Sequence, residues 1–473
     1  GFKGMTVSDW GGTHSTMGAA LGGLNVQMTG DNYLGQPLID SIRAGRLSEE
    51  IVNDRVREIL RLRFAIEPIP EDVANTVQTS QPESRQTAYN VAAKSVVLLK
   101  NEGGVLPLKN DKVKKIAVIG RNAVATTAAG GMGAGVKTPY EITPLLGLQN
   151  RSNGRFEISY APAYKNFAGM FGRMMGGANA AEIAATIDEA PDATMLAEAV
   201  ALAKEADLVI FVAGTGKNVE TEGSDRQNIM LPVGQDQVIK ALAEVNPNIV
   251  TVIISGGPVD LNEVNKYSPA IVQGWWNGIE GGHALADILY GEIAPSGKLP
   301  FTFPVKLTDT GAHSMGEFGG RGEVVYGEGL LVGYRWNDAK DVAPLFAFGH
   351  GLSYTTFEYG EATIDKTSMN KKGSVTVTIP VTNTGKRAGK EVVQLYIADK
   401  EASVMRPEKE LKGFAKVELE PGQTKEVSFV IDAEALSFFD DKKHEWVAEQ
   451  GEFEALVGAA SDDIKSSVTF TLK

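Results

Sequence analysis

The chain has 473 residues, of which 43% are hydrophobic and 22% are charged, and its formal net charge is −13. This composition is typical of a globular protein, and the length predicts about three folding units. The acidic balance argues against nucleic acid as a partner and favours a neutral or cationic ligand. The sequence contains no cysteine, which excludes disulfides and thiolate metal sites.

No run of about 18 apolar residues is present, so no helix that crosses a membrane is expected. The chain starts with Gly1 inside a predicted strand. We therefore expect that N-terminal sequence is missing, together with any targeting signal. A periplasmic or secreted bacterial location is favoured, although the lack of cysteine fits the cytoplasm as well.

Residues 1–66 alternate short apolar runs with helical patterns. Met5–Ser8 and Leu24–Met28 predict strands, whereas Thr16–Leu21, Leu38–Ala44 and Glu49–Arg63 predict helices. This alternation is typical of α/β proteins. It provides only two strand–helix units, whereas a (β/α)8 barrel has eight such units and roughly 250 residues. Residues 67–83 carry several prolines and predict a linker.

Residues 84–305 predict a second domain with a largely parallel sheet covered by helices on both faces, because its apolar strands are continuous and separated by helices. A helix at Gln86–Lys100 is expected to open the domain and to turn Val91 inward. The predicted strands are Ile116–Gly120, Leu208–Ala213, Ile249–Ser255 and Ile271–Trp275, and the helices between them are Ala193–Glu205, Gln235–Glu244 and His283–Leu289.

Residues 306–370 predict a connecting segment, and residues 371–473 predict a β-sandwich. From Val375 to Val381, apolar residues alternate with polar ones, and turn residues such as Pro421-Gly422 separate several short strands. The other predicted strands are Val392–Ile397, Lys412–Leu419, Glu426–Ile431, Phe453–Val457 and Val468–Leu472.

Two segments carry candidate chemistry. Asp9 follows the first predicted strand, which is where barrel folds keep their active sites, and Trp10 beside it could stack on a sugar. The alternative is that Asp9 caps a turn and Trp10 is a core residue. The second segment is the loop after Leu208–Ala213, which contains Glu220 and Glu222. Its alternative is a solvated polar loop.

Paired carboxylates can cleave a glycosidic bond. One carboxylate attacks or stabilises the anomeric carbon, and a second carboxyl group protonates the leaving oxygen. In a retaining enzyme the two groups lie roughly 5–5.5 Å apart. Here they would come from different domains.

Several motifs together resemble glycoside hydrolase family 3, the β-glucosidase family. Gly1–Gly11 is similar to the nucleophile segment, and Glu220–Arg226 is similar to the acid/base loop. Further matching segments follow in the same order: Gly281–Asp287, Pro295–Pro304, Glu328-Gly329, Val332–Arg335, Phe346–Phe357, Arg406-Pro407 and Glu410–Phe414.

The resemblance implies a retaining exo-β-glycosidase that acts on a β-glucoside or oligosaccharide, without a cofactor or a metal. Asp9 would be the nucleophile and Glu222 the acid/base, because the family's glutamate directly precedes a Gly-x-Asp-Arg element. Trp10 would help to form the sugar subsite. Glu220 is the alternative acid and a candidate substrate-binding residue, and Asp225 with Arg226 would hold the loop's shape.

The same resemblance implies the fold: the end of a (β/α)8 barrel, a doubly covered mostly parallel α/β sandwich, and a fibronectin type III-like β-sandwich. Most of the barrel is lacking, so activity is expected for the complete enzyme and is doubtful for this chain alone. The alternatives are a β-xylosidase, or a non-catalytic fragment that binds carbohydrate or mediates oligomerisation, for example as a homodimer.

Other patterns predict less. The glycine-rich stretch Gly130–Gly135 lacks the order of a nucleotide-binding motif, so a loop near the substrate is the preferred interpretation. The five histidines are scattered without metal-ligand spacing. Of Trp275 and Trp276, one is expected in the core and the other could reach the cleft.

Overall fold

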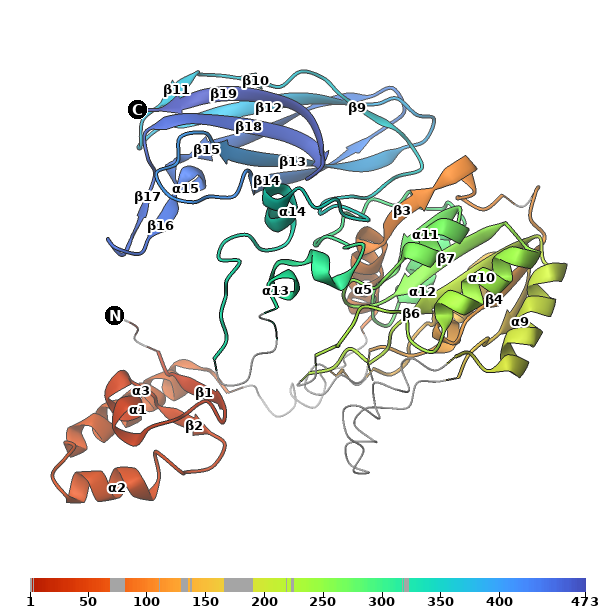
Figure 1. The fold of residues 1–473 in the computed structure, drawn as a ribbon. Coiled ribbons are helices and arrows are strands. Elements are labelled where there is room, and N and C mark those ends of the chain that lie inside the picture. The colour runs from red at the N-terminus through yellow and green to blue at the C-terminus, as the bar shows by residue number, and fades with distance from the viewer. Residues whose placement is uncertain are drawn as a thin grey trace. The chain divides into compact units, whose positions relative to one another are not determined.

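The computed structural model describes the whole chain apart from residues 1, 3, 69–80, 110, 129–134, 137, 166–189, 218, 223, 224, 317 and 319–322. It consists of two units, Gly1–Thr79 and Ser80–Lys473, which we describe separately (Figure 1). The boundary falls inside the expected linker, residues 67–83. Most of the glycine-rich stretch Gly130–Gly135 lies outside the described residues.

The first unit contains a β-α-β unit followed by two helices. Strands β1 (Val7–Trp10) and β2 (Val26–Met28) pair in parallel and are joined by α1 (Thr16–Gly22). Helices α2 (Gln36–Arg43) and α3 (Glu49–Ala65) follow. Strand β1 therefore continues two residues beyond the expected end at Ser8, so that Asp9 and Trp10 belong to the strand.

Helix α3 begins where the sequence indicates. The Ser48 hydroxyl accepts a hydrogen bond from the backbone N–H of Glu50 at 3.2 Å, and Glu49 and Glu50 lie in the first turn. The capping side chain satisfies a backbone donor that has no partner within the helix, and the two carboxylates favour the positive end of the helix dipole.

The second unit is built around a six-stranded sheet with the order β3-β8-β7-β6-β4-β5 (Figure 1). Strands β8, β7, β6, β4 and β5 are parallel, and β3 is antiparallel at the edge. The strands are β3 Val97–Asn101, β4 Lys115–Ile119, β5 Glu157–Ala161, β6 Leu208–Gly214, β7 Ile249–Ile254 and β8 Ala270–Gln273.

Helices cover both faces of this sheet, as the continuous apolar strands predict. Along β6, Val209, Phe211 and Ala213 pack with α9 (Ala193–Glu205) and α10 (Gln235–Val245). The alternate β6 residues pack on the other face with α6 (Pro144–Ser152) and α12 (Gly281–Leu289). All residues of β6 are buried, which explains why the strand is apolar throughout.

The expectation of one helix over Gln86–Lys100 is wrong. Helix α5 (Pro82–Ser95) ends at Ser95, and the apolar run that follows is the edge strand β3. In the strand, successive residues of this run pack alternately against the cores on the two faces of the sheet. Val91, expected to face inward, is 62% exposed. Helix α5 also begins two residues before the end of the expected linker.

The C-terminal part is a β-sandwich of a five-stranded sheet, β11-β19-β18-β13-β14, and a four-stranded sheet in which β12 pairs with β10, β15 and β9. Its core consists of alternate residues from both sheets. The strands are β9 Phe357–Tyr359, β10 Thr363–Ile364, β11 Ser368–Met369, β12 Ser374–Asn383, β13 Gly389–Asp399, β14 Glu410–Leu419, β15 Thr424–Asp432, β18 Gly451–Ala460 and β19 Asp463–Leu472. Strands β9, β10 and β11 lie within the expected connecting segment, residues 306–370, so the sandwich begins earlier than the sequence indicates.

The segment before the sandwich pairs with the α/β domain. Leu352 forms a β-bridge with Leu98 of β3, and Phe346 forms one with Phe303. The remaining described elements are η1 Glu102–Gly104, η2 Arg121–Val124, α11 Asn262–Tyr267, η4 Leu307–Asp309, α13 Gly311–Ser314, α14 Tyr334–Lys340, α15 Ala433–Leu436, β16 Phe438–Asp440 and β17 Glu445–Val447.

Candidate active site

Asp9 and Trp10 are the last two residues of β1 in the first unit. Both side chains are exposed, Trp10 to 74%. Asp9 Oδ1 accepts a hydrogen bond from the Trp10 backbone N–H at 2.7 Å, and the Asp9 carbonyl oxygen accepts one from Gly12 at 3.0 Å. Trp10 is therefore not a core residue of this unit. The turn after β1 is closed by the Asp9 backbone, which leaves its carboxylate at the surface.

The end of β1 is held by β2. The backbone N–H of Met28 donates to Ser8 Oγ at 2.9 Å, and the Met28 carbonyl oxygen accepts from Gly11 at 2.9 Å. At the start of β1, Asn25 Oδ1 accepts from the Thr6 backbone N–H at 2.7 Å, while Asn25 Nδ2 donates to Glu58 Oε2 of α3 at 2.8 Å. The segment thus depends on a few local contacts.

The second candidate segment is the loop after β6, at the carboxyl edge of the parallel sheet. Of this loop, residues 219–222 and 225–226 are described. Glu222 and Asp225 are exposed, whereas Glu220 and Arg226 are partly buried. The two glutamates, only two residues apart, therefore occupy different environments.

Glu220 is bound by its own unit through both carboxylate oxygens. Oε2 accepts hydrogen bonds from the backbone N–H groups of Gly256 and Gly257, at 3.0 and 3.1 Å, and Oε1 accepts one from the Thr215 hydroxyl. Arg226 Nη1 lies 3.9 Å from Oε1, and Arg226 Nη2 donates to the Pro258 carbonyl oxygen at 2.9 Å. Glu220 and Arg226 thus hold the described part of the loop, and the expected structural role of Asp225 stays a prediction.

Gly256 and Gly257 follow β7 and were not singled out from the sequence. A Cβ atom on Gly256 would lie 2.7 Å from Glu220 Oε2, and one on Gly257 would lie 3.2 Å from Arg226 Nη2. The absence of side chains allows the acidic loop to approach the backbone after β7. The Gly-Gly pair at the end of a buried strand is the sequence signal that could have predicted this approach.

A buried polar network fixes the end of β6 below the loop. Gln235 Oε1 accepts from Gly214 N–H, and Gln235 Nε2 donates to the Gly214 carbonyl oxygen, both at 2.8 Å. Asn122 Nδ2 donates to the Thr215 carbonyl oxygen at 2.7 Å, and the Tyr164 hydroxyl donates to Asn122 Oδ1 at 2.9 Å. Buried polar groups that are fully paired define one backbone position, so the network sets where the loop starts.

Trp275 and Trp276 are both partly buried after β8. Trp275 Nε1 donates to the Ser95 carbonyl oxygen at 2.7 Å, and Trp276 packs against the core. His350 Nε2 lies 2.8 Å from the Leu99 carbonyl oxygen, and burial lowers the pKa of His350. The expected reach of one tryptophan into the cleft stays a prediction.

No group of three or more histidine, cysteine, aspartate or glutamate residues in the described part of the chain is placed to hold a metal ion. Likewise, no helix among the described residues is both long and apolar enough to span a membrane.

Asp9 and Glu222 belong to different units, Gly1–Thr79 and Ser80–Lys473. Each carboxylate lies at or after the carboxyl end of a parallel strand and is exposed. The spacing of roughly 5–5.5 Å expected for a retaining pair stays a prediction.

Two family models match the chain. Residues 96–354 match the glycosyl hydrolase family 3 C-terminal domain, and residues 391–461 match a fibronectin type III-like domain. These matches support the α/β domain and the β-sandwich of the second unit.

Relatives similar to the chain carry β-glucosidase names. The chain is 43% identical to Beta-glucosidase BoGH3A of Bacteroides ovatus and 37% identical to Thermostable beta-glucosidase B of Acetivibrio thermocellus, over 99% and 98% of its own length. It spans 64% and 58% of those two proteins. The chain therefore covers about three fifths of the length of these relatives.

Solved structures that are similar to this chain are also those of β-glucosidases. A GH3 β-glucosidase from Bifidobacterium adolescentis superposes with a TM-score of 0.84 at 33% identity, covering 100% of this chain and 65% of that one. A β-glucosidase from Kluyveromyces marxianus, solved in complex with glucose, superposes with a TM-score of 0.85 at 28% identity, covering 100% and 73%. With the family model matching more than half of its residues, the chain belongs to glycosyl hydrolase family 3.

Proposed function

We propose that this protein is a retaining exo-β-glycosidase that removes terminal β-D-glucosyl residues. Asp9 attacks the anomeric carbon while Glu222 donates a proton to the leaving oxygen, so that the glycosidic bond breaks and a glycosyl ester forms on Asp9. In the second step water attacks the same carbon, Glu222 accepts its proton, and the Asp9 carboxylate leaves. Trp10 contributes an exposed aromatic face to the sugar subsite.

The observation that carries the choice of acid is the contrast between Glu220 and Glu222. Both oxygens of Glu220 accept hydrogen bonds from groups of the same unit, whereas Glu222 is exposed. A general acid has to deliver a proton to a bound substrate, so an exposed carboxyl group on a loop suits the role better than the partly buried carboxylate of Glu220. We propose that the main role of Glu220 is to hold the loop in place, and that binding of the substrate is only its second role.

We propose further that β1, α1 and β2 are part of a (β/α)8 barrel. The parallel β-α-β unit and the position of Asp9 at a strand's carboxyl end support this. Because the relatives are longer than this chain, we propose that full activity requires barrel sequence beyond these residues.

The test measures hydrolysis of 4-nitrophenyl β-glucoside by the protein encoded by the longest reading frame that contains this chain. The 473-residue chain alone is assayed in parallel. Glu222→Ala should lower turnover by about 10²–10⁴-fold, and added azide should restore part of it by forming a glycosyl azide. Asp9→Asn should abolish turnover, and azide should not restore it.

Wild-type rates in both variants would overturn the assignment, and azide rescue of Glu220→Ala instead of Glu222→Ala would move the acid to Glu220. Faster turnover of the matching xyloside would favour a β-xylosidase. A long reading frame without turnover would favour the non-catalytic alternative.

A further inference from the structure

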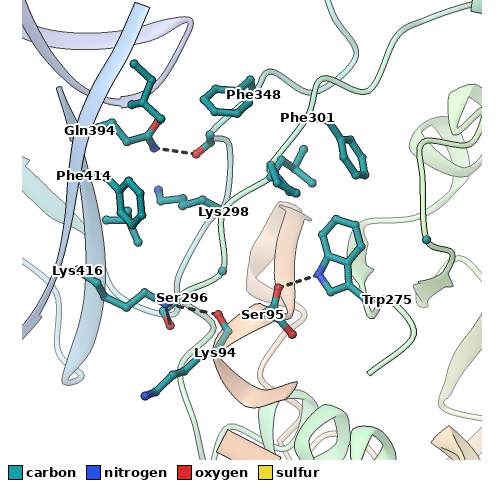
Figure 2. Close-up of a pocket in the computed structure, with 17 residues that line it drawn as sticks. Lys94, Ser95, Trp275, Ser296, Lys298, Phe301, Phe348, Gln394, Phe414 and Lys416 are labelled. Carbon is teal, nitrogen blue, oxygen red and sulfur yellow. Dashed lines mark hydrogen bonds between the residues drawn. The ribbon is translucent and has the colours of Figure 1, made fainter. Parts of the chain in front are cut away.

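A cavity of about 600 Å³ lies inside the second unit, where the α/β domain meets the β-sandwich (Figure 2). One wall consists of the end of α5, Trp275 and the segment 296–301, and the other consists of β13 and β14. Its volume is within the usual range for small-molecule sites. Asp9, Trp10, Glu220 and Glu222 are not among its lining residues.

The lining is mainly aromatic and aliphatic. The Trp275 and Phe301 rings pack edge to face with centroids 5.6 Å apart, and Phe348 stacks on Tyr334 at 4.7 Å. Across the cavity, Phe414 of β14 is 68% exposed (Figure 2). A large exposed aromatic side chain at the mouth of an apolar cavity is typical of a binding surface.

Lys416 places a positive charge on the same wall as Phe414, since residues two apart on a strand share a face. Its Nζ donates to Ser296 Oγ at 3.1 Å and to the Lys94 carbonyl oxygen at 3.4 Å. Among the described residues, no carboxylate lies within ion-pair distance of Lys416 or Lys94. The ammonium group of Lys416 thus binds only neutral oxygens.

The surroundings of Lys416 disfavour its charge. Partial desolvation lowers the pKa of Lys416 most, followed by the positive charges of Lys390, Lys94 and Lys298, and only Glu391 opposes them. Glu391 is itself paired with Lys298 at 3.0 Å. An anion bound beside Lys416 would therefore relieve an excess of positive charge.

The sandwich wall of the cavity is held in one position. Gln394 of β13 lies opposite Phe414 in the strand register. Its Nε2 donates to the carbonyl oxygens of Gly349 and Ala459, at 3.1 and 2.6 Å, and its Oε1 accepts from the Tyr396 hydroxyl at 2.6 Å. With these polar groups already paired, few remain to bind the many hydroxyl groups of a sugar.

We propose that this cavity binds a small aromatic monocarboxylate, with its carboxylate against Lys416 and its ring between Phe414 and Trp275. The Lys416 ammonium group beside an aromatic wall matches an anionic group on an apolar body. The proposal is independent of the glycosidase chemistry, because it uses none of the proposed catalytic residues.

Isothermal titration calorimetry of the printed chain with 4-phenylbutanoate tests the proposal, with 4-phenylbutanamide as its neutral counterpart. We expect the acid to bind about tenfold more tightly than the amide, because a charge-assisted contact is lost in the amide. Lys416→Met should weaken acid binding by about tenfold and leave the amide unchanged, whereas Lys416→Arg should retain most of the acid affinity. Phe414→Ala should weaken both ligands.

Lys465→Met is the matched control, because Lys465 pairs with Asp463 and does not line the cavity. Thermal melting of each variant checks that the fold is kept. Equal binding of acid and amide, unchanged acid binding in Lys416→Met, or no acid binding at millimolar concentration would overturn the proposal. Displacement of the acid by phenyl β-glucoside at equal affinity would overturn it too, because it would show that the cavity itself binds a sugar.

Discussion

The two strand ends that carry the proposed catalytic carboxylates are supported in different ways. The loop after β6 is held by residues from several parts of the chain, including Asn122, Gln235 and the glycine pair after β7. The end of β1 is held mainly by β2, with Asn25 joining its start to α3. The difference teaches that the α/β domain supports its carboxylate loop from several of its elements, whereas the Asp9 segment relies mainly on one paired strand.

Replacing Glu220 should give the largest effect on this comparison. Glu220→Ala leaves the N–H groups of Gly256 and Gly257 without their acceptor, and we expect a loss of about 2 kcal/mol in the free energy of unfolding of the second unit. Glu220→Gln keeps an acceptor oxygen and should cost less than about 1 kcal/mol. Denaturant unfolding and hydrogen exchange of the two glycine amides measure the effect.

The control for this experiment is Glu244→Ala, an exposed glutamate on α10. If Glu220→Ala and Glu244→Ala unfold alike, the loop is not supported by Glu220 and the comparison between the two strand ends fails.

Asp236, in the first turn of α10, makes the stability of the second unit depend on pH. Burial, followed by the negative charges of Asp260 and Glu263, raises the pKa of Asp236 to about 6. The folded state therefore binds this proton more tightly than the unfolded state, so stability is lost as pH rises from about 4 to about 6. Asp236→Asn should stabilise the protein by about 1–2 kcal/mol at pH 7 and by almost nothing at pH 4.

Urea unfolding at both pH values measures this difference. Asp111→Asn, at an exposed position, provides the control and should show no such dependence on pH. An equal effect of Asp236→Asn at pH 4 and pH 7 would contradict the raised pKa.

Asn25→Ala should have the smallest effect. It removes the acceptor of the Thr6 N–H and the donor to Glu58, and we expect a loss of about 1 kcal/mol in the first unit. Hydrogen exchange of the amides in Gly1–Thr79 measures it. Asn53→Ala, which removes one exposed contact to Glu50, should cost less. A loss at Asn25 larger than that at Glu220 would reverse the comparison.

The sequence predicts the elements whose signals are local. The helix Ala193–Glu205 has the expected bounds, and α3 begins at Glu49 as expected, because apolar spacing acts within a few residues. The strand Val97–Asn101 lies mostly within the predicted helix Gln86–Lys100. An apolar run that directly follows a helix has no local signal that the secondary structure changes. Parallel pairing is predicted from the alternation of strands and helices, and the β-sandwich is predicted from the alternation of apolar and polar residues.

The candidate site was predicted only in part. The loop of Glu220 and Glu222 stands out as acidic residues after a strand, but nothing in its own sequence distinguishes the two environments. Glu220 contacts Gly256, 36 residues later in the chain, and this contact depends on how β6 and β7 pair. Such a distant contact follows from sheet order, which single-sequence patterns do not specify.

The pairing of Leu352 with β3 has a consequence for domain exchange between relatives. The segment that leads to the sandwich extends the α/β sheet, and Gln394 of the sandwich binds back to Gly349 of that segment. A chimaera joined at residue 305 or residue 371 would therefore separate a strand-like segment from one of its two partners. A recombination junction that spares both interfaces would have to move the α/β domain, the segment and the sandwich together as one inherited block.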